Sequence, residues 1–133
     1  MPNRPLMEEA LSSSVIGAFY EVYNIFGYGF SESVYLAALE WELIRRGHKV
    51  AREVSICIWY KGDPIAWQRV DMVVDDVIIV EAKATPKLRS DASKQCYHYL
   101  RASKLEVGLV LGFGCEPEFF RLYCPKSPRE ADA

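Results

Sequence analysis

The stretch RVDMVVDDVIIVEAKA, residues 69–84, decides the fold of this chain and raises its chemical question. Two runs rich in Val and Ile flank a short polar turn, which predicts two antiparallel strands joined as a hairpin. Asp71, Glu81 and Lys83 lie inside these apolar runs. Because an unpaired buried charge costs several kcal/mol, these three side chains must face water, pair with one another or hold a ligand.

The register of this hairpin decides whether the three charges meet. Glu81 and Lys83 share one face of their strand, because residues two apart in a strand point the same way. A two-residue turn would set Asp71 opposite residue 80, on the wrong side, whereas a three-residue turn over 75–77 sets it opposite residue 81. We therefore predict an odd-length turn or a bulge, which Asp supports because it tolerates left-handed backbone geometry.

Patterns on both sides of the hairpin predict the remaining elements. Apolar residues at helical spacing predict three helices, over residues 8–26, 32–46 and 89–103. Alternating or uniformly apolar runs predict five strands, over residues 50–60, 65–74, 77–84, 106–113 and 118–123. A strand, helix, strand unit forms a right-handed crossover, which makes its two strands parallel. The order ααβββαββ therefore predicts an α/β fold with a mixed β-sheet flanked by helices.

Length and composition bound the domain count and the compartment. The 133 residues, half of them hydrophobic, are enough for one ordinary domain and too few for two. We expect a single domain over residues 1–123 and a mobile C-terminal tail over 124–133, which has little apolar surface. The chain has no apolar run of membrane-spanning length and opens with acids in place of a secretory signal, so we expect a cytoplasmic protein without a membrane partner.

Cysteines and charge exclude some functional classes and leave others open. The four cysteines are far apart and form no CxxC pair, which favours free thiols over a zinc site or a disulfide framework. The formal net charge is −2, yet residues 83–104 carry six basic side chains and one acid, so this segment is about +5. A basic strip of this kind is either a solvated helix face or a surface that follows a nucleic-acid backbone.

The acids in the strands suggest a cation site. Two carboxylates brought together repel each other unless a proton or a cation lies between them. Their oxygen atoms suit a hard divalent ion, Mg²⁺ or Mn²⁺, better than zinc. The alternative is that Lys83 simply neutralises Asp71 and Glu81 at the end of a sheet.

The spacing of these residues carries a resemblance to a known family. Asp71, Glu81 and Lys83, in the pattern D-x9-E-x-K on adjacent strands and followed by a helix with Gln95, resemble the PD-(D/E)XK nuclease superfamily. Val70 stands where that family has Pro. The resemblance implies a restriction-endonuclease-like fold.

A second motif extends the resemblance upstream. Gly29, Glu32 and Tyr35 follow the spacing GxxExxY, and the segment is similar to the small bacterial and archaeal proteins of that superfamily that are named after this signature. Together the two motifs and the hairpin make the likeness cover the chain from about residue 8 to residue 123.

The resemblance also implies roles for individual residues. The implied catalytic residues are Asp71, Glu81, Lys83 and Gln95, with Lys83 orienting or activating the attacking water. The implied ligands of Mg²⁺ or Mn²⁺ are Glu32, Asp71, Glu81 and the backbone carbonyl of Ala82. The basic strip and the helix face beside Gln95 supply the expected nucleic-acid contacts, Lys87, Arg89, Lys94, Tyr99 and Arg101.

These expectations lead to a leading function and its rivals. The leading one is a metal-dependent nuclease that hydrolyses phosphodiester bonds, with DNA favoured over RNA. The rivals are a catalytically silent module that binds nucleic acid or protein while keeping the fold, and a purely structural acidic cluster. The short chain has little surface for sequence recognition, which favours a homodimer or a protein partner. Trp59, Tyr60 and Trp67 could stack on bases, although core or dimer contacts are the commoner use of strand aromatics.

Overall fold

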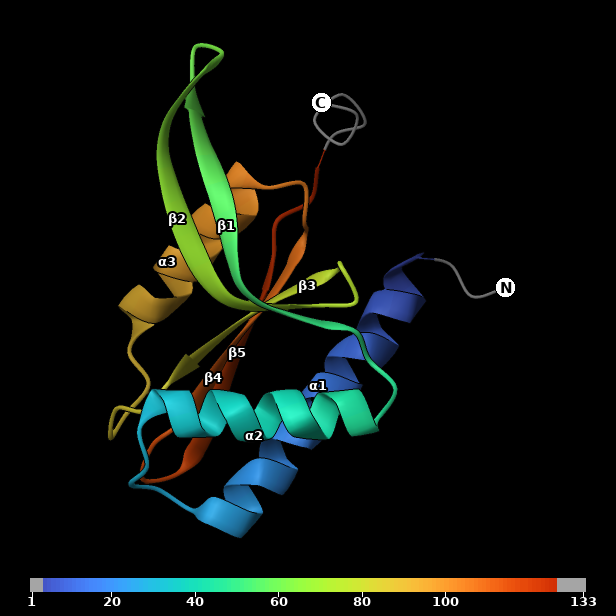
Figure 1. Ribbon diagram of the computed structural model, residues 1–133, viewed down its shortest axis with the longest axis vertical. Helices are drawn as coiled ribbons and strands as arrows, with labels where there is room; N and C mark the ends of the chain where they lie inside the picture. Colours follow the sequence, from blue (N-terminus) through green and yellow to red (C-terminus); the bar gives the residue numbers. More distant parts are fainter. Residues whose placement is uncertain (1–3, 127–133) are drawn as a thin grey trace.

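A five-stranded mixed sheet with helices on both faces forms the framework of the molecule (Figure 1). The computed structural model describes residues 4–126, with side chains from residue 8 onward. The elements are α1 (Arg4–Phe26), α2 (Glu32–Arg45), β1 (Val50–Tyr60), β2 (Asp63–Val74), β3 (Ile78–Lys83), α3 (Ser90–Ala102), β4 (Val107–Phe113) and β5 (Pro117–Tyr123). The predicted order ααβββαββ is confirmed. None of the helices in this part of the chain combines the length and apolar character needed to cross a membrane.

The strands follow one another across the sheet in chain order, β1-β2-β3-β4-β5. β3 and β4 are parallel and are joined through α3, whereas the other neighbouring strands are antiparallel. The predicted parallel crossover is therefore confirmed. β4 is buried along its whole length, as its uniformly apolar sequence predicts for a strand covered on both faces.

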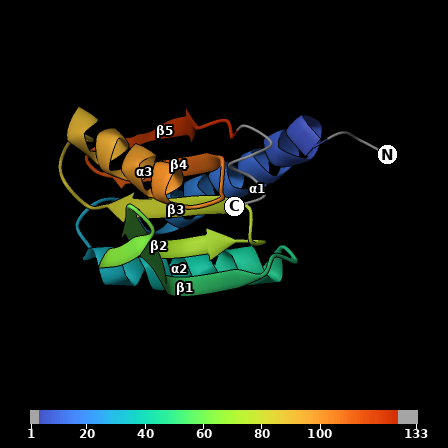
Figure 2. The same cartoon turned by 90° about the horizontal axis from the view of Figure 1, so that it is seen from above.

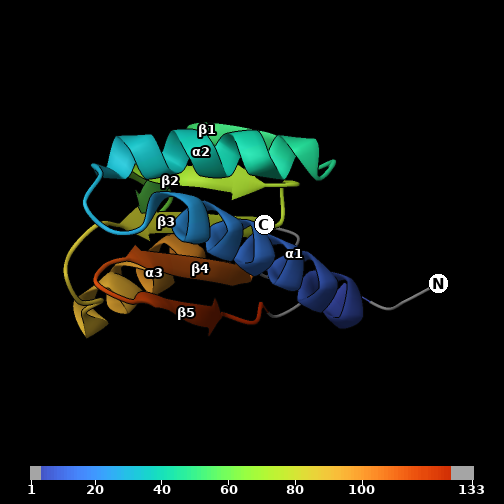
Figure 3. The ribbon, with the colours of Figure 1, turned by 90° about the horizontal axis from the view of Figure 1, so that it is seen from below.

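Two hydrophobic layers sit on opposite faces of the sheet. One contains α1 and α2, and the other contains α3 (Figures 2 and 3). Val80 and Ala82 pack in the first layer and Ile79 packs in the second. By strand alternation Glu81 and Lys83 lie on the α3 face. The frame of Val and Ile thus holds the polar side chains toward one helix.

The turn between β2 and β3 has the predicted odd length. Val74 pairs with Ile78, which leaves a three-residue loop, and the pairing continues to Met72 opposite Val80. Asp75 and Asp76 have φ angles of 52° and 57°, in the left-handed region. Both the odd turn and its Asp geometry are confirmed, so Asp71 comes beside residue 81.

β1 and β2 form a long hairpin that projects beyond the rest of the sheet (Figure 1). Its turn is shorter than expected, because Lys61 and Gly62 alone connect the strands with φ angles of 49° and 84°. β2 therefore begins at Asp63, two residues before the predicted start. Pro64 is accommodated beside an irregularity of the pairing near Trp59, a position where a missing N–H is tolerated.

A backbone irregularity lies within the same hairpin, level with the polar site. Glu53 has a φ of 51°, unusual for a non-glycine residue in a strand. The pairs on either side, Arg52 with Met72 and Val54 with Val70, are formed, but Glu53 and Asp71 are not paired. No sequence pattern indicated this break.

Contacts at the start of α2 and after β5 complete the described fold. Ser31 precedes α2 but makes no side-chain cap bond, and its hydroxyl lies 3.0 Å from that of Ser33. At the start of the segment expected to be a tail, Cys124 is buried, and the Lys126 amino group donates to the Leu100 carbonyl at 2.6 Å. Residues 127–133 lie outside the described part of the chain.

Candidate active site

The sheet opens where the two acids lie. The β2–β3 pairing ends at Met72 and Val80, and beyond it side chains replace the ladder bonds. The Ala82 N–H donates to Asp71 Oδ2 at 2.8 Å, and the Asp71 N–H donates to Glu81 Oε1 at 3.2 Å. Each carboxylate is therefore fixed by the backbone of the neighbouring strand.

Glu81 lies in an environment that disfavours its charge. Its side chain is only 5% exposed. Burial and, next, the adjacent Asp71 carboxylate raise the pKa of Glu81 from 4.5 to about 8, while Lys83 acts in the opposite direction. In the metal-free protein the pair therefore holds a proton near neutral pH, and a cation placed between the two acids would replace that proton.

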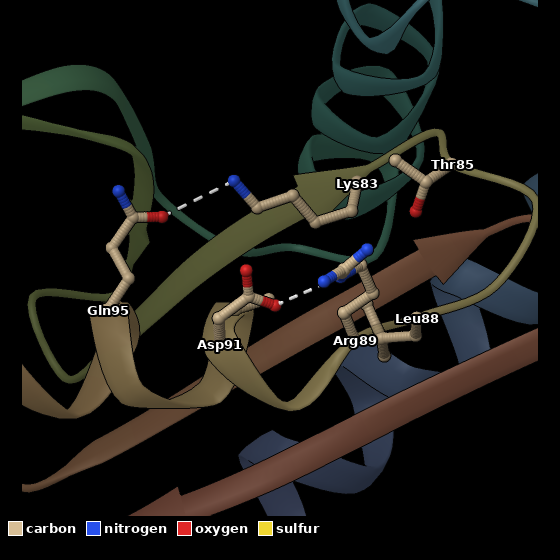
Figure 4. Close-up of a pocket in the computed structure, with 7 residues that line it drawn as sticks. Lys83, Thr85, Leu88, Arg89, Asp91 and Gln95 are labelled. Carbon is tan, nitrogen blue, oxygen red and sulfur yellow. Dashed lines mark hydrogen bonds and ion pairs between the residues drawn. The ribbon is translucent and has the colours of Figure 1, made fainter.

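Lys83 and Gln95 form the second part of the site (Figure 4). The Lys83 amino group donates to Gln95 Oε1 at 3.3 Å, which ties the end of β3 to α3. Both residues line a cavity of about 310 Å³ in which Arg89 and Asp91 also lie, with 3.5 Å between Arg89 Nε and Asp91 Oδ1. Asp91 was not among the predicted site residues, although its spacing of four from Gln95 places both on one helix face.

The donor set fits a hard divalent cation. Asp71 and Glu81 supply carboxylate oxygens that are already adjacent. The Ala82 N–H points toward the side from which β2 has departed, and the carbonyl of a strand residue points to the same side as its N–H. The expected ligand atom is therefore directed at the gap between β2 and β3.

Glu32 does not join this pair. It is an exposed residue in the first turn of α2, and that end of α2 lies toward the same end of the molecule as the C-terminus of β3 (Figures 1 and 3). Among residues 8–126, no three His, Cys, Asp or Glu side chains lie close enough together to hold a metal ion. The structure thus gathers two of the expected carboxylate ligands and leaves the third apart.

The expected nucleic-acid contacts divide into surface and core residues. Lys87, Arg89, Lys94 and Arg101 are all exposed, as a basic surface requires. Tyr99 is only 6% exposed and packs in the core beneath α3, so its expected role as a surface contact is not supported. The helical spacing that placed Tyr99 beside Gln95 could not distinguish the rim of the site from the layer below it.

Tyr99 lies close to the acids instead. Burial raises the pKa of its hydroxyl, and the charges of Glu81 and Asp71 raise it further. The hydroxyl therefore stays protonated at neutral pH.

A hydrogen-bonded chain that the sequence did not reveal supports the β2–β3 turn. His48 Nε2 lies 2.7 Å from Ser14 Oγ, and His48 Nδ1 lies 2.8 Å from Asp75 Oδ2. The Lys49 N–H adds a bond to Asp75 Oδ1 at 2.7 Å. The His48 ring thus joins α1 to the turn that sets the register. Ser14 lies inside α1, where the backbone N–H groups bond within the helix and are not free to act as oxyanion donors beside its hydroxyl. The hydrogen-bonded chain of Ser14, His48 and Asp75 is therefore a structural link between α1 and the turn.

Comparisons with known proteins agree with this geometry. A family model described as PD-(D/E)XK nuclease superfamily matches residues 9–122. A search of curated proteins found no match. A solved structure described as "Crystal structure of SSO0001" is similar in fold, with a TM-score of 0.53 and 18% sequence identity over 93% of this chain. The matched region spans 63% of that structure, which is the longer of the two chains.

Proposed function

Because the chain belongs to the PD-(D/E)XK nuclease superfamily, we propose that it is a metal-dependent nuclease that hydrolyses phosphodiester bonds, with DNA preferred over RNA. The observation that carries the proposal is the pair Asp71 and Glu81, held at the opening of the sheet with Lys83 on the same face. The motif around Glu32 and Tyr35 adds the proposal that the chain belongs to the GxxExxY group of this superfamily.

In this proposal some residues would bind the metal ion and others would orient the attacking water or bind the nucleic-acid backbone. Asp71, Glu81 and the Ala82 carbonyl would hold Mg²⁺ or Mn²⁺, with Glu32 a candidate additional ligand. The bound ion would lower the pKa of a water and offset charge on the phosphate. Lys83 would orient that water, and Gln95 holds the Lys83 amino group in place. Lys87, Arg89, Lys94 and Arg101 would follow the phosphate backbone.

A cleavage assay tests this proposal. Purified protein is incubated with plasmid, linear and single-stranded DNA and with RNA, in Mg²⁺, Mn²⁺ or EDTA. We expect cleavage that EDTA abolishes, and a fall of at least about 100-fold for Lys83→Ala and Asp71→Asn, because each removes a positioned group at the reaction centre. Lys61→Ala, at the exposed hairpin turn, is the matched control. Equal cleavage by all four proteins would contradict the assigned site.

A second candidate is a silent module that binds nucleic acid or protein and keeps the fold. The observation that favours it is the position of Glu32, which leaves only two carboxylates gathered within the described residues. Calorimetry with Mn²⁺ separates the candidates. Binding that Glu81→Gln abolishes, in a protein that cuts nothing, supports the module, whereas no binding leaves the purely structural cluster.

A homodimer or a protein partner remains part of the proposal. Ile25 and Trp41 are 71% and 67% exposed, and they line one apolar hollow between α1 and α2. This face lies on the opposite side of the sheet from the acids and α3. Light scattering after size-exclusion chromatography would measure the oligomeric state.

A further inference from the structure

The projecting hairpin and α3 enclose a groove that the reaction centre does not use. Its main hollow, of about 770 Å³, lies between β1 and the C-terminal end of α3. A second hollow of about 400 Å³ includes His98 and shares Trp59, Arg101 and Ala102 with the first. We call the two together the hairpin groove. Its volume lies in the range of sites that take a nucleotide-sized ligand.

The groove continues from the candidate active site. Gln95 lines the cavity beside Lys83, and His98 lines the groove three residues later on α3. Residues three apart are neighbours on a helix face. The path from Gln95 to Arg101 is about 9 Å along the helix axis, so one bound strand can reach from the acids into the groove.

The charge of the groove selects an anion. Arg101, Lys104 and Lys126 line the main hollow, and none of its lining residues is acidic. Lys126 is already bonded to the Leu100 carbonyl, whereas no carboxylate within residues 8–126 forms an ion pair with Arg101 or Lys104. In a chain whose formal net charge is −2, this lining is complementary to phosphate.

Trp59 gives the groove a flat apolar wall. Its side chain is 61% exposed although it lines both hollows, so part of the indole is open to a ligand. The sequence pattern favoured core or dimer contacts for this residue, but the structure places it in neither core layer. Bases stack on such a side chain only when they are unpaired, because bases in a duplex stack on one another.

We propose that the hairpin groove binds an unpaired nucleic-acid strand, with a base stacked on Trp59 and phosphates at Arg101 and Lys104. The inference rests on the proposed nuclease function and narrows its substrate class to nucleic acids with a single-stranded segment next to the cleaved bond. Arg101 and Lys104 would bind the phosphates of the nucleic-acid backbone. The Trp59 indole would stack only on an unpaired base, because the bases of a continuous duplex offer no free face.

Binding measurements in EDTA test the groove separately from cleavage. Fluorescence anisotropy is recorded for a labelled oligothymidylate strand and for its duplex with oligodeoxyadenylate. We expect Trp59→Ala to weaken binding of the single strand at least about fivefold and to leave duplex binding unchanged. We expect Arg101→Ala to make the slope of log K against log salt shallower by about 0.7 for the single strand, because one phosphate contact is lost.

Two control variants match these changes on the opposite face of the sheet. Trp41 is exposed to a similar degree as Trp59, and Arg45 occupies the last turn of α2 as Arg101 does in α3. We expect Trp41→Ala and Arg45→Ala to bind both probes as the wild type does.

The groove and the nuclease can fail independently. Three results would each contradict binding of an unpaired strand in the hairpin groove. They are wild-type affinity of Trp59→Ala for the single strand, an equal loss of affinity for the single strand and the duplex, and no binding by the wild type. If the groove proposal is contradicted in this way but cleavage in Mn²⁺ still depends on Lys83, the nuclease proposal remains valid. If nothing is cut but Trp59→Ala loses the single strand selectively, the groove stands and the nuclease proposal falls.

Discussion

At the scale of single residues, the protonation of Glu81 makes the stability of the fold depend on pH. Its native pKa is raised from 4.5 to about 8, chiefly by burial and then by Asp71. Unfolding between these pH values therefore releases a proton, since the unfolded chain ionises near the lower value. The stabilising effect of the protonated side chain is complete at acidic pH and is lost as the pH rises toward about 8.

A pH series of unfolding measures this effect. In EDTA we expect the free energy of unfolding of the wild type to fall between about pH 5 and about pH 8. Glu81→Gln keeps a similar shape without the titration, so its curve should be flatter in the same range. Urea unfolding followed by circular dichroism gives both curves. Parallel curves would show that Glu81 ionises at its ordinary pKa in the folded protein.

Several residues of the site could be predicted because their placement follows from strand alternation. The faces of Glu81 and Lys83, and the register that brings Asp71 to them, follow from a period of two and a turn of odd length. The burial of Tyr99 and the separate position of Glu32 could not be predicted, because both depend on how a helix packs against the sheet.

At the scale of elements, the hairpin of β1 and β2 changes direction beside the acids. Glu53 adopts a left-handed backbone opposite Asp71, and the strand pairing is interrupted there. The Arg69–Glu53 ion pair is 3.5 Å long, and both side chains are about two-thirds exposed, so it contributes little. The main cost at this position therefore lies in the backbone.

Two substitutions of Glu53 separate backbone strain from charge. We expect Glu53→Gly to stabilise the protein by about 0.5–1 kcal/mol, because glycine adopts a positive φ without the steric cost. Glu53→Gln keeps the strain and removes the charge, so its effect should stay within about 0.5 kcal/mol. Urea unfolding at neutral pH measures both. Destabilisation by glycine would show that the Glu53 side chain supports the bend.

The elements themselves were predicted well where periodicity is strong, and less well at their connections. The turn between the first two strands was expected over residues 61–64, whereas the pairing irregularity near Trp59 allows Pro64 inside β2. The tie between His48 and Asp75 joins segments 27 residues apart, and local patterns carry no signal for such contacts.

At the scale of the whole molecule, the acids should make stability depend on a divalent ion. A ligand that binds only the folded state stabilises it, by about 2.7 kcal/mol at 100 times its dissociation constant. We expect Mn²⁺ to raise the melting temperature of the wild type relative to EDTA, and to have no effect on Asp71→Asn. Differential scanning fluorimetry measures the shift.

The control for this experiment is Glu21→Gln, which removes an exposed acid from α1 on the other face of the sheet. It should respond to Mn²⁺ as the wild type does. An equal response from Asp71→Asn would place the stabilising ion elsewhere on the molecule.

The opening of the sheet also bears on how such a chain would change over generations. Asp71 and Glu81 accept backbone N–H groups at the end of two strands, so a descendant that no longer cuts would still be stabilised by an acceptor side chain at both positions. Lys83 contributes less to the stability of the fold, since among the described residues its amino group makes one hydrogen bond, to the exposed Gln95. After a loss of activity, substitutions should therefore accumulate first at Lys83. A retained Lys83 is a better sign of an active enzyme than retained Asp71 and Glu81.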